Sequence, residues 1–156
     1  MGRTALINAV NYGKTDVVDR LLQNKDCQIN ISDCTGNTAI FYATENLDLN
    51  IVDKLIVNGS NICHITKLGH TLLHSAAKSE NPKVLKCILS LGLDINQQDN
   101  YGFTPLMHAV QNNNNKMVEI LLEYGADTRI KTTNRKTAID YATNEEIKEL
   151  LNRYSS

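Results

Sequence analysis

Apolar residues along this chain occur as closely spaced pairs separated by polar turns. In four places a second apolar pair begins four residues after the first, at 17–18 and 21–22, 51–52 and 55–56, 84–85 and 88–89, and 117–118 and 121–122. Positions i, i+1, i+4 and i+5 form one continuous face of an α-helix, which is the face that packs into a core. Gly59, Gly92 and Gly125 follow the last three of these stretches, and glycine readily takes the left-handed conformation that ends a helix. The pattern therefore predicts four amphipathic helices.

A shorter segment precedes each of these helices and begins with a Gly-x-Thr motif. The glycines of the motif are Gly2, Gly36, Gly69 and Gly102, at intervals of 34, 33 and 33 residues, and a fifth copy at 135–139 lacks the glycine. In every copy an alanine follows the threonine by five residues. Because threonine caps helix N-termini and alanine lets neighbouring helices approach closely, each copy predicts a short helix. We therefore expect ten helices in five antiparallel pairs.

This unit resembles the ankyrin repeat, whose period is 33 residues and whose motif is Gly-x-Thr-Pro-Leu-His-x-Ala. The match is carried by 102–106, Gly-Phe-Thr-Pro-Leu, by 69–77, which includes His74, and by 121–127, Leu-Leu-Glu-Tyr-Gly-Ala-Asp. A tetratricopeptide array has a similar period, but its tryptophan-containing pattern is missing. The resemblance covers the whole chain. It implies an all-α solenoid of stacked helix-turn-helix pairs with β-hairpin loops.

The repeat pattern predicts a single domain, 1–156, and some irregularity at both ends of it. We place the five repeats at about 1–32, 33–65, 66–98, 99–131 and 132–156. The first unit has an extra residue near Cys27 and no glycine stop, so its hairpin is expected to be irregular. The last unit is about four residues short, and its final helix has a polar outer face of the kind that caps a repeat array.

Composition and charge exclude several classes of protein. Sixteen Lys and Arg against seventeen Asp and Glu give a net charge of −1, so we expect no nucleic-acid partner. No apolar run approaches the roughly 20 residues of a membrane-spanning helix, and we expect no membrane association. The four cysteines form no Cys-x-x-Cys motif and are typical of reduced thiols in the cytoplasm or nucleus. Abundant Asn, Ile and Lys also fit the AT-rich genome of a protist, a poxvirus or an intracellular bacterium, and in the last two cases the protein could be delivered into a host cell.

The sequence contains no recognisable catalytic, cofactor or metal motif. A phosphate-binding loop, a Gly-x-Ser-x-Gly elbow and a His-Glu-x-x-His motif are all missing. His70 and His74 have the i, i+4 spacing of a helical metal pair. However, His74 matches a structural histidine of the family and His70 precedes the expected helix start. We therefore predict no enzyme, no cofactor and no metal. Asn96 fits either a hydrogen bond to a hairpin backbone or a hydroxylation site.

The resemblance implies that partners bind to the hairpin tips and to the concave face formed by the first helices. The candidate residues are those that the repeat pattern does not dictate. They are Leu68, His70, Tyr101, Phe103, Tyr12, Lys67, Asn100, Lys78, Gln111 and Asn112. Exposed aromatic side chains of this kind contribute most of the binding energy in many interfaces. The alternative for Tyr101 and Phe103 is that they pack on the next tip.

The predicted function is a non-catalytic interaction module or scaffold that binds a protein partner. Two alternatives remain at this point. The chain would be an inhibitor that occludes the active site of a partner enzyme, or an effector of a virus or intracellular bacterium that binds a host factor. In each case we expect a monomer.

Overall fold

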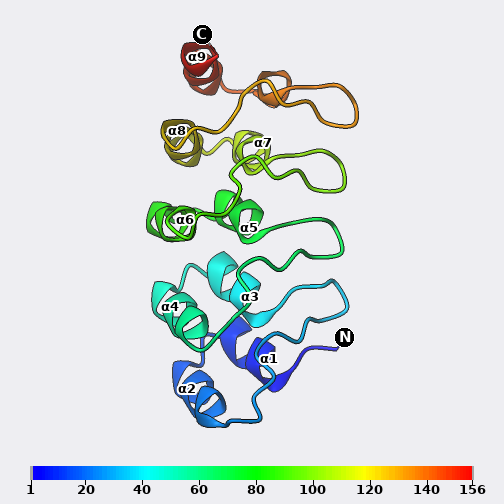
Figure 1. The fold of residues 1–156 in the computed structure, drawn as a ribbon. Coiled ribbons are helices and arrows are strands. Elements are labelled where there is room, and N and C mark those ends of the chain that lie inside the picture. Colours follow the sequence, from blue (N-terminus) through cyan, green and yellow to red (C-terminus); the bar gives the residue numbers. More distant parts are fainter. Residues whose placement is uncertain (1, 156) are drawn as a thin grey trace.

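The chain forms a stack of five helical pairs with loops projecting to one side (Figure 1). The computed structural model describes residues 2–155, so the first and last residues of the predicted domain lie outside it. The first members of the pairs are α1 (Ala5–Asn11), α3 (Ala39–Glu45), α5 (Leu72–Lys78), α7 (Pro105–Gln111) and the short 3-10 helix η1 (Ala138–Tyr141). The second members are α2 (Thr15–Gln23), α4 (Leu49–Val57), α6 (Pro82–Leu89), α8 (Asn115–Glu123) and α9 (Glu145–Tyr154).

The principal packing contacts join each pair to its neighbours. Helix α3 packs on α1 and α5, α7 packs on α5 and η1, and α8 packs on α6 and α9. The core between them is a continuous aliphatic layer, in which Ile40, Leu73 and Leu106 are almost completely buried. The predicted all-α solenoid is therefore confirmed. In the described part of the chain, no helix is both long enough and apolar enough to cross a membrane.

Polar side chains start the helices, mostly as the sequence predicts. Thr4 Oγ1 accepts a hydrogen bond from the backbone N–H of Ile7 at 3.1 Å, and Thr104 Oγ1 caps α7 in the same way by accepting from the N–H of Met107. Such a cap satisfies a backbone donor that the helix itself cannot pair. The prediction is wrong for Thr38, whose hydroxyl oxygen is buried without a hydrogen-bond partner among the described residues.

The loops between pairs are hydrogen-bonded to one another along the stack. The backbone N–H of Lys67 donates to Thr35 O at 3.2 Å, and that of Asn100 donates to Leu68 O at 3.0 Å. The N–H of Thr133 continues the series by donating to Tyr101 O of the preceding tip at 3.1 Å. The tips therefore form a connected ridge rather than independent flexible loops.

The last unit departs from the expected ten α-helices. Its first helix is reduced to the four-residue 3-10 helix η1, because the shortened unit turns directly from Ala142 toward α9. The missing glycine also has a structural cost, since Arg135 takes a φ of 61°. Asp140 stands at the position of the family's histidine, and its carboxylate accepts the equivalent hydrogen bond from the N–H of Thr137 at 2.7 Å.

Leu47 offers a test of backbone strain in this fold. Its φ is 64° at the turn between α3 and α4, where the first pair has Gly13 with a φ of 62°. A left-handed conformation costs a residue with a Cβ atom roughly 1–2 kcal/mol, and Leu47 is exposed. Leu47→Gly should therefore raise the free energy of unfolding by about 1 kcal/mol in urea titrations.

The reverse change at Gly13 is the matched control. A Cβ atom there would meet nothing within 4 Å, so Gly13→Ala tests strain without a steric clash. It should lower stability by about 1 kcal/mol. If Gly13→Ala raised stability, or if Leu47→Gly lowered it, the left-handed backbone conformation at this turn would not be the source of the strain.

Candidate interaction surface

Two neighbouring tips place apolar side chains in solvent. Leu68 and Tyr101 are 47% and 57% exposed, and they occupy equivalent positions on the loops before α5 and α7. The two loops are held together by the Asn100 N–H to Leu68 O bond and by a second bond from Asn100 Nδ2 to Lys67 O at 2.9 Å. We call Leu68, Tyr101, Lys67 and Asn100 the tip ridge. Its backbone is fixed, so its side chains are presented in a defined arrangement.

His70 and Phe103 lie differently from the exposed tip positions that the sequence predicted for them. The His70 ring stacks on His74 with centroids 5.6 Å apart, and only 18% of its side chain is exposed. Phe103 is half-buried, with its ring 4.9 Å from Tyr141 and 5.4 Å from His108. Both side chains therefore line the groove between the tips and the first helices. Phe103 packs against Tyr141 of η1 in the next unit, rather than on the next tip.

The groove contains an acid–imidazole cluster that links two pairs. His108 Nε2 lies 2.9 Å from Asp99 Oδ2, and His70 Nε2 lies 3.4 Å from the same oxygen. The other oxygen of Asp99 accepts backbone N–H bonds from Tyr101 and Phe103, both at 2.9 Å. We call His70, Asp99 and His108 the His–Asp–His junction. Asp99 and His108 were not among the residues predicted from the sequence.

The same three repeat positions carry different residues between the first two pairs. There Arg3, Asp33 and Tyr42 replace His70, Asp99 and His108 in turn. Tyr42 donates its hydroxyl to Asp33 Oδ2 at 2.6 Å, and Arg3 donates to the Tyr42 oxygen at 3.1 Å. The Arg3 guanidinium also lies over the Tyr42 ring, 4.7 Å from its centroid. This Arg–Asp–Tyr junction shows that the position accepts a basic group, an acid and an aromatic ring.

Burial keeps the groove histidines uncharged near neutral pH. It lowers the pKa of His74 and of His108 to about 4, and it also lowers the pKa of His70. His74 has a fixed tautomer, because the Thr71 N–H donates to its Nδ1 at 3.1 Å and its Nε2–H donates to Phe103 O at 3.0 Å. These bonds confirm the structural role predicted for His74.

The remaining predicted residues lie along the helix ends. Tyr12, at the end of α1, is strongly exposed, and Gln111 at the end of α7 is also exposed. Lys78 is half-buried in the groove, with its Nζ 3.5 Å from a ring nitrogen of His70. Asn112 bridges two units by donating from Nδ2 to Lys78 O at 3.5 Å. Asn112 therefore helps to connect the stack as well as facing solvent.

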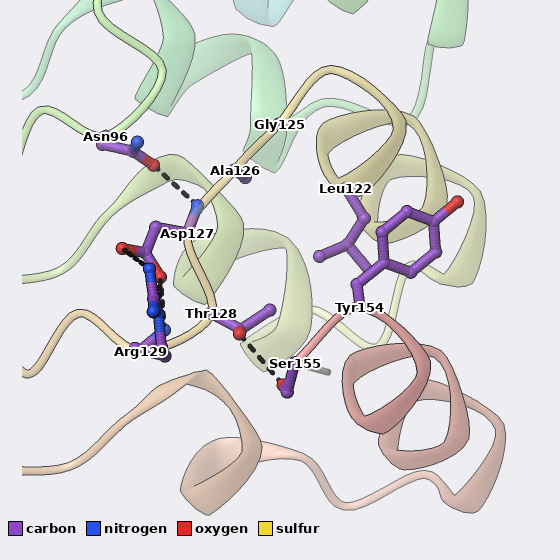
Figure 2. Close-up of a pocket in the computed structure, with 9 residues that line it drawn as sticks. All are labelled: Asn96, Leu122, Gly125, Ala126, Asp127, Thr128, Arg129, Tyr154 and Ser155. Carbon is purple, nitrogen blue, oxygen red and sulfur yellow. Dashed lines mark hydrogen bonds and ion pairs between the residues drawn. The ribbon is translucent and has the colours of Figure 1, made fainter.

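Asn96 lies at an open polar cleft next to the ends of α8 and α9, shown in Figure 2. The cleft has a volume of about 520 Å³. Asn96 Oδ1 accepts the backbone N–H of Asp127 at 2.9 Å, and Thr128 Oγ1 lies 2.9 Å from Ser155 Oγ (Figure 2). The hydrogen bond to a hairpin backbone predicted for Asn96 is thus confirmed. The polar groups of the cleft are bonded to each other and do not converge on a common point.

Comparison with known families agrees with this architecture. Three overlapping matches to the family described as ankyrin repeats cover residues 1–66, 46–132 and 73–154. The chain belongs to the ankyrin repeat family. Ankyrin repeats generally mediate protein–protein interaction, and the match indicates no catalytic family.

Curated relatives of this ankyrin repeat chain come from a virus, a bacterium and a fungus. It is 40% identical over 77 residues to an ankyrin repeat protein of Fowlpox virus, covering 49% of this chain and 18% of the relative. It is 34% identical over 100 residues to one of Rickettsia felis, covering 63% of this chain and 32% of the relative. A Stachybotrys chartarum ankyrin repeat domain-containing protein is 30% identical over 93 residues, 60% of this chain and 5% of its own length. The matched regions therefore span less than a third of each relative.

Asp33 in the Arg–Asp–Tyr junction makes the stability of the folded chain depend on pH in the acid range. Burial by itself would raise its pKa, but hydrogen bonds from Thr35, Tyr42 and Asn37 outweigh burial and lower the pKa from 3.8 to about 2. Arg3 and Tyr42 are the ionisable groups in contact with it, and Glu45 lies close enough to interact with it electrostatically. Since the unfolded chain binds the proton more readily, the stabilisation is present above pH 3.8 and lost as the pH falls toward 2. Its full size is about 2 kcal/mol.

The expected result is a steeper acid loss of stability in the native chain than in Asp33→Asn. Urea titrations from pH 7 to pH 3 should show an extra loss of about 1 kcal/mol in the native chain. Equal slopes for the two proteins would mean that Asp33 has an ordinary pKa in the folded state.

Proposed function

We propose that this chain is a non-catalytic module that binds a protein partner through the tip ridge and the adjoining groove. The exposure of Leu68 and Tyr101 on hydrogen-bonded neighbouring tips carries the proposal. Neither side chain is needed to fill the core, and each presents apolar surface that a partner would bury. Lys67 and Asn100 supply a polar edge beside them.

The rigidity of the ridge supports binding. A loop that must become ordered on association loses conformational entropy, which weakens the complex. Here backbone hydrogen bonds between tips already hold the loops, and Asp99 holds the Tyr101 loop from inside through two further N–H bonds. Tyr101 also has few rotatable bonds for the area it offers. The ridge therefore needs little reorganisation on binding.

The groove adds polar specificity beneath this apolar ridge. Glu45 ends α3, Ser75 and Lys78 lie on the next first helix, α5, and Ser75 Oγ donates to Glu45 Oε1 at 3.4 Å. Partial burial lowers the pKa of Lys78, while the carboxylates of Glu45 and Asp99 act in the opposite direction. A segment of partner chain that enters the groove meets an acid and a base close together. Lys78 and Gln111 are therefore proposed to contact the partner, with Tyr12 at the far end of the same face.

Tyr101→Ala is expected to weaken partner binding by roughly thirtyfold, or about 2 kcal/mol, because an exposed aromatic anchor is lost from the centre of the interface. The melting temperature should change little, since Tyr101 is mostly in solvent. The measurement is quantitative mass spectrometry of proteins captured from lysate by immobilised wild-type and variant chains, followed by titration of the captured partner.

Tyr124→Ala is the matched control for this experiment. Tyr124 is the same residue type with 50% exposure, but it lies at the end of α8, away from the tips. The partner should be lost with Tyr101→Ala and kept with Tyr124→Ala. Retention by both variants, or loss with Tyr124→Ala alone, contradicts the assignment of the tip ridge.

An effector that binds a host factor is the second candidate. Its support is that relatives occur in Fowlpox virus and in Rickettsia felis, both of which live inside host cells. The chain would then act in the cytoplasm or nucleus of the host. Capture from host-cell lysate, compared with lysate of the source organism, separates this candidate from an internal scaffold. If the captured partner is an enzyme and the purified chain inhibits it, the chain acts as an inhibitor that occludes the active site of its partner.

A further inference from the structure

We propose that the His–Asp–His junction is a binding site for a divalent transition-metal ion, with zinc as the expected occupant. Two imidazoles and one carboxylate are a ligand set that zinc uses when it keeps a fourth position open. No metal was expected from the sequence, because the only pair considered was His70 with His74, in which His74 matches a structural histidine and His70 precedes the helix start. The stacking of two repeats instead brings His70 next to His108, a pairing that the spacing along the chain does not reveal.

The distances among the three ligand atoms fit one ion. His70 Nε2 and His108 Nε2 lie 3.4 Å and 2.9 Å from Asp99 Oδ2. The ligand atoms of the three residues all lie within 4.8 Å of one another. Tetrahedral zinc with bonds of about 2.0–2.1 Å separates its ligand atoms by about 3.4 Å. The widest of these separations therefore has to shorten by up to about 1.4 Å, shared between the side chains, to close the site.

The surroundings of the site hold the carboxylate in a suitable orientation. Asp99 Oδ1 accepts the N–H groups of Tyr101 and Phe103, which leaves Oδ2 directed at the two imidazoles. Outer hydrogen bonds of this kind orient ligands and strengthen metal binding. The Asp99 side chain is only 1% exposed, while His70 and His108 keep some access to solvent. The ion would enter from the groove, and its fourth position would face the groove.

Two features of the junction must change when the ion binds. His108 directs Nε2 at Asp99 as a hydrogen-bond partner, so this proton must move to Nδ1 to free the Nε2 lone pair. The Lys78 ammonium, 3.5 Å from the His70 ring, must turn away on its flexible stem. Its positive charge opposes the ion, so Lys78→Gln should increase zinc affinity. This increase is opposite to the effect of losing a ligand.

The chain supplies its own metal-free counterpart of the site. The Arg–Asp–Tyr junction places a guanidinium and a phenol at the positions of His70 and His108, around an equivalent buried aspartate. A double variant, His70→Arg with His108→Tyr, therefore copies a junction that already exists in this fold. It should remain folded, as circular dichroism and urea titration would show. It should also lose zinc binding by at least tenfold.

The experiment titrates zinc into the purified native chain by calorimetry and follows the histidine ring nitrogens by NMR. We expect one equivalent to bind, with shifts at His70 and His108 and little change at His64, whose Nε2 bonds to Gly36 O at 2.8 Å. His64→Gln is the matched histidine control and should bind zinc normally. Cobalt in place of zinc reports thiolate ligands by their charge-transfer absorption, which we expect to be missing.

Unchanged zinc affinity in the double variant would overturn the proposal. Ring-nitrogen signals of His70 and His108 that do not move at one equivalent would also overturn it, as would a cobalt spectrum with thiolate bands. Binding of the protein partner is measured separately, so failure of the metal site leaves the proposed interaction surface intact.

Discussion

Gly102→Ala is expected to lower the free energy of unfolding by about 3 kcal/mol. Gly102 has a φ of 80°, and a Cβ atom there would lie 2.7 Å from Thr133 N and 2.9 Å from Thr132 Cα. Both contacts are with backbone, which cannot turn aside. The substitution would therefore add strain at its own residue and push two hydrogen-bonded tips apart. Urea titration and thermal melting provide the measurement.

Gly125→Ala separates these two causes. Gly125 has a similar φ of 87°, but a Cβ atom there meets nothing within 4 Å. Gly125→Ala should therefore lower the free energy of unfolding only through backbone strain at that residue, by about 1 kcal/mol. Equal losses at Gly102 and Gly125 would mean that the close approach of the tips contributes nothing to stability.

Leu121→Ala is expected to cost about 2–5 kcal/mol, the range for truncating a fully buried leucine. Leu121 is 0% exposed on α8, which packs against α6 on one side and α9 on the other. The cavity would therefore weaken contacts to both neighbouring pairs. A solenoid has no other long-range contacts to compensate for such a loss.

Val57→Ala is the control for this truncation. Val57 is 85% exposed at the end of α4, so removing its methyl groups should change stability by less than about 0.5 kcal/mol. A loss below about 1 kcal/mol for Leu121→Ala would indicate that the core can collapse around the gap or that α8 is loosely packed.

Much of the fold could be predicted from sequence because its signals are local and repeated. Paired apolar residues such as Leu121 and Leu122 lie on one helix face and are buried as expected, whereas Val17 of the first pair is 45% exposed. The threonine before each first helix marks its start regardless of distant contacts. The shortened last unit was also recognised, but its 3-10 geometry was not, since a helix of four residues depends on how the next helix docks.

Side-chain direction in the loops was harder to predict. Leu68 and Tyr101 precede their glycines and face solvent, whereas His70 and Phe103 follow the same glycines and face the groove. The chain reverses direction at the glycine. Leu68 and Tyr101 lie within this turn, whereas His70 and Phe103 lie on the returning arm, where their carbonyls accept the N–H groups of Thr66 and Asp99. The sequence shows where the reversal occurs but not which side meets the helices.

The His–Asp–His junction was missed for a different reason. Its members come from two units, and only the stacking of α7 on α5 brings them together. A signal was nevertheless present in the periodic alignment. Asp99 and His108 occupy the positions of Asp33 and Tyr42, and His70 occupies the position of Arg3. Comparing units column by column, rather than scanning for motifs along the chain, would have identified the cluster.

The most direct test of the proposed interaction surface is site-specific photo-crosslinking. A photoreactive phenylalanine analogue is placed at Tyr101 in one protein and at Tyr124 in another, two positions with similar exposure on different parts of the molecule. Each protein is irradiated in lysate, and the crosslinked partner is identified by mass spectrometry. We predict a specific partner crosslink from position 101 and none from position 124. A partner that crosslinks from position 124 and never from position 101 would contradict binding through the tip ridge.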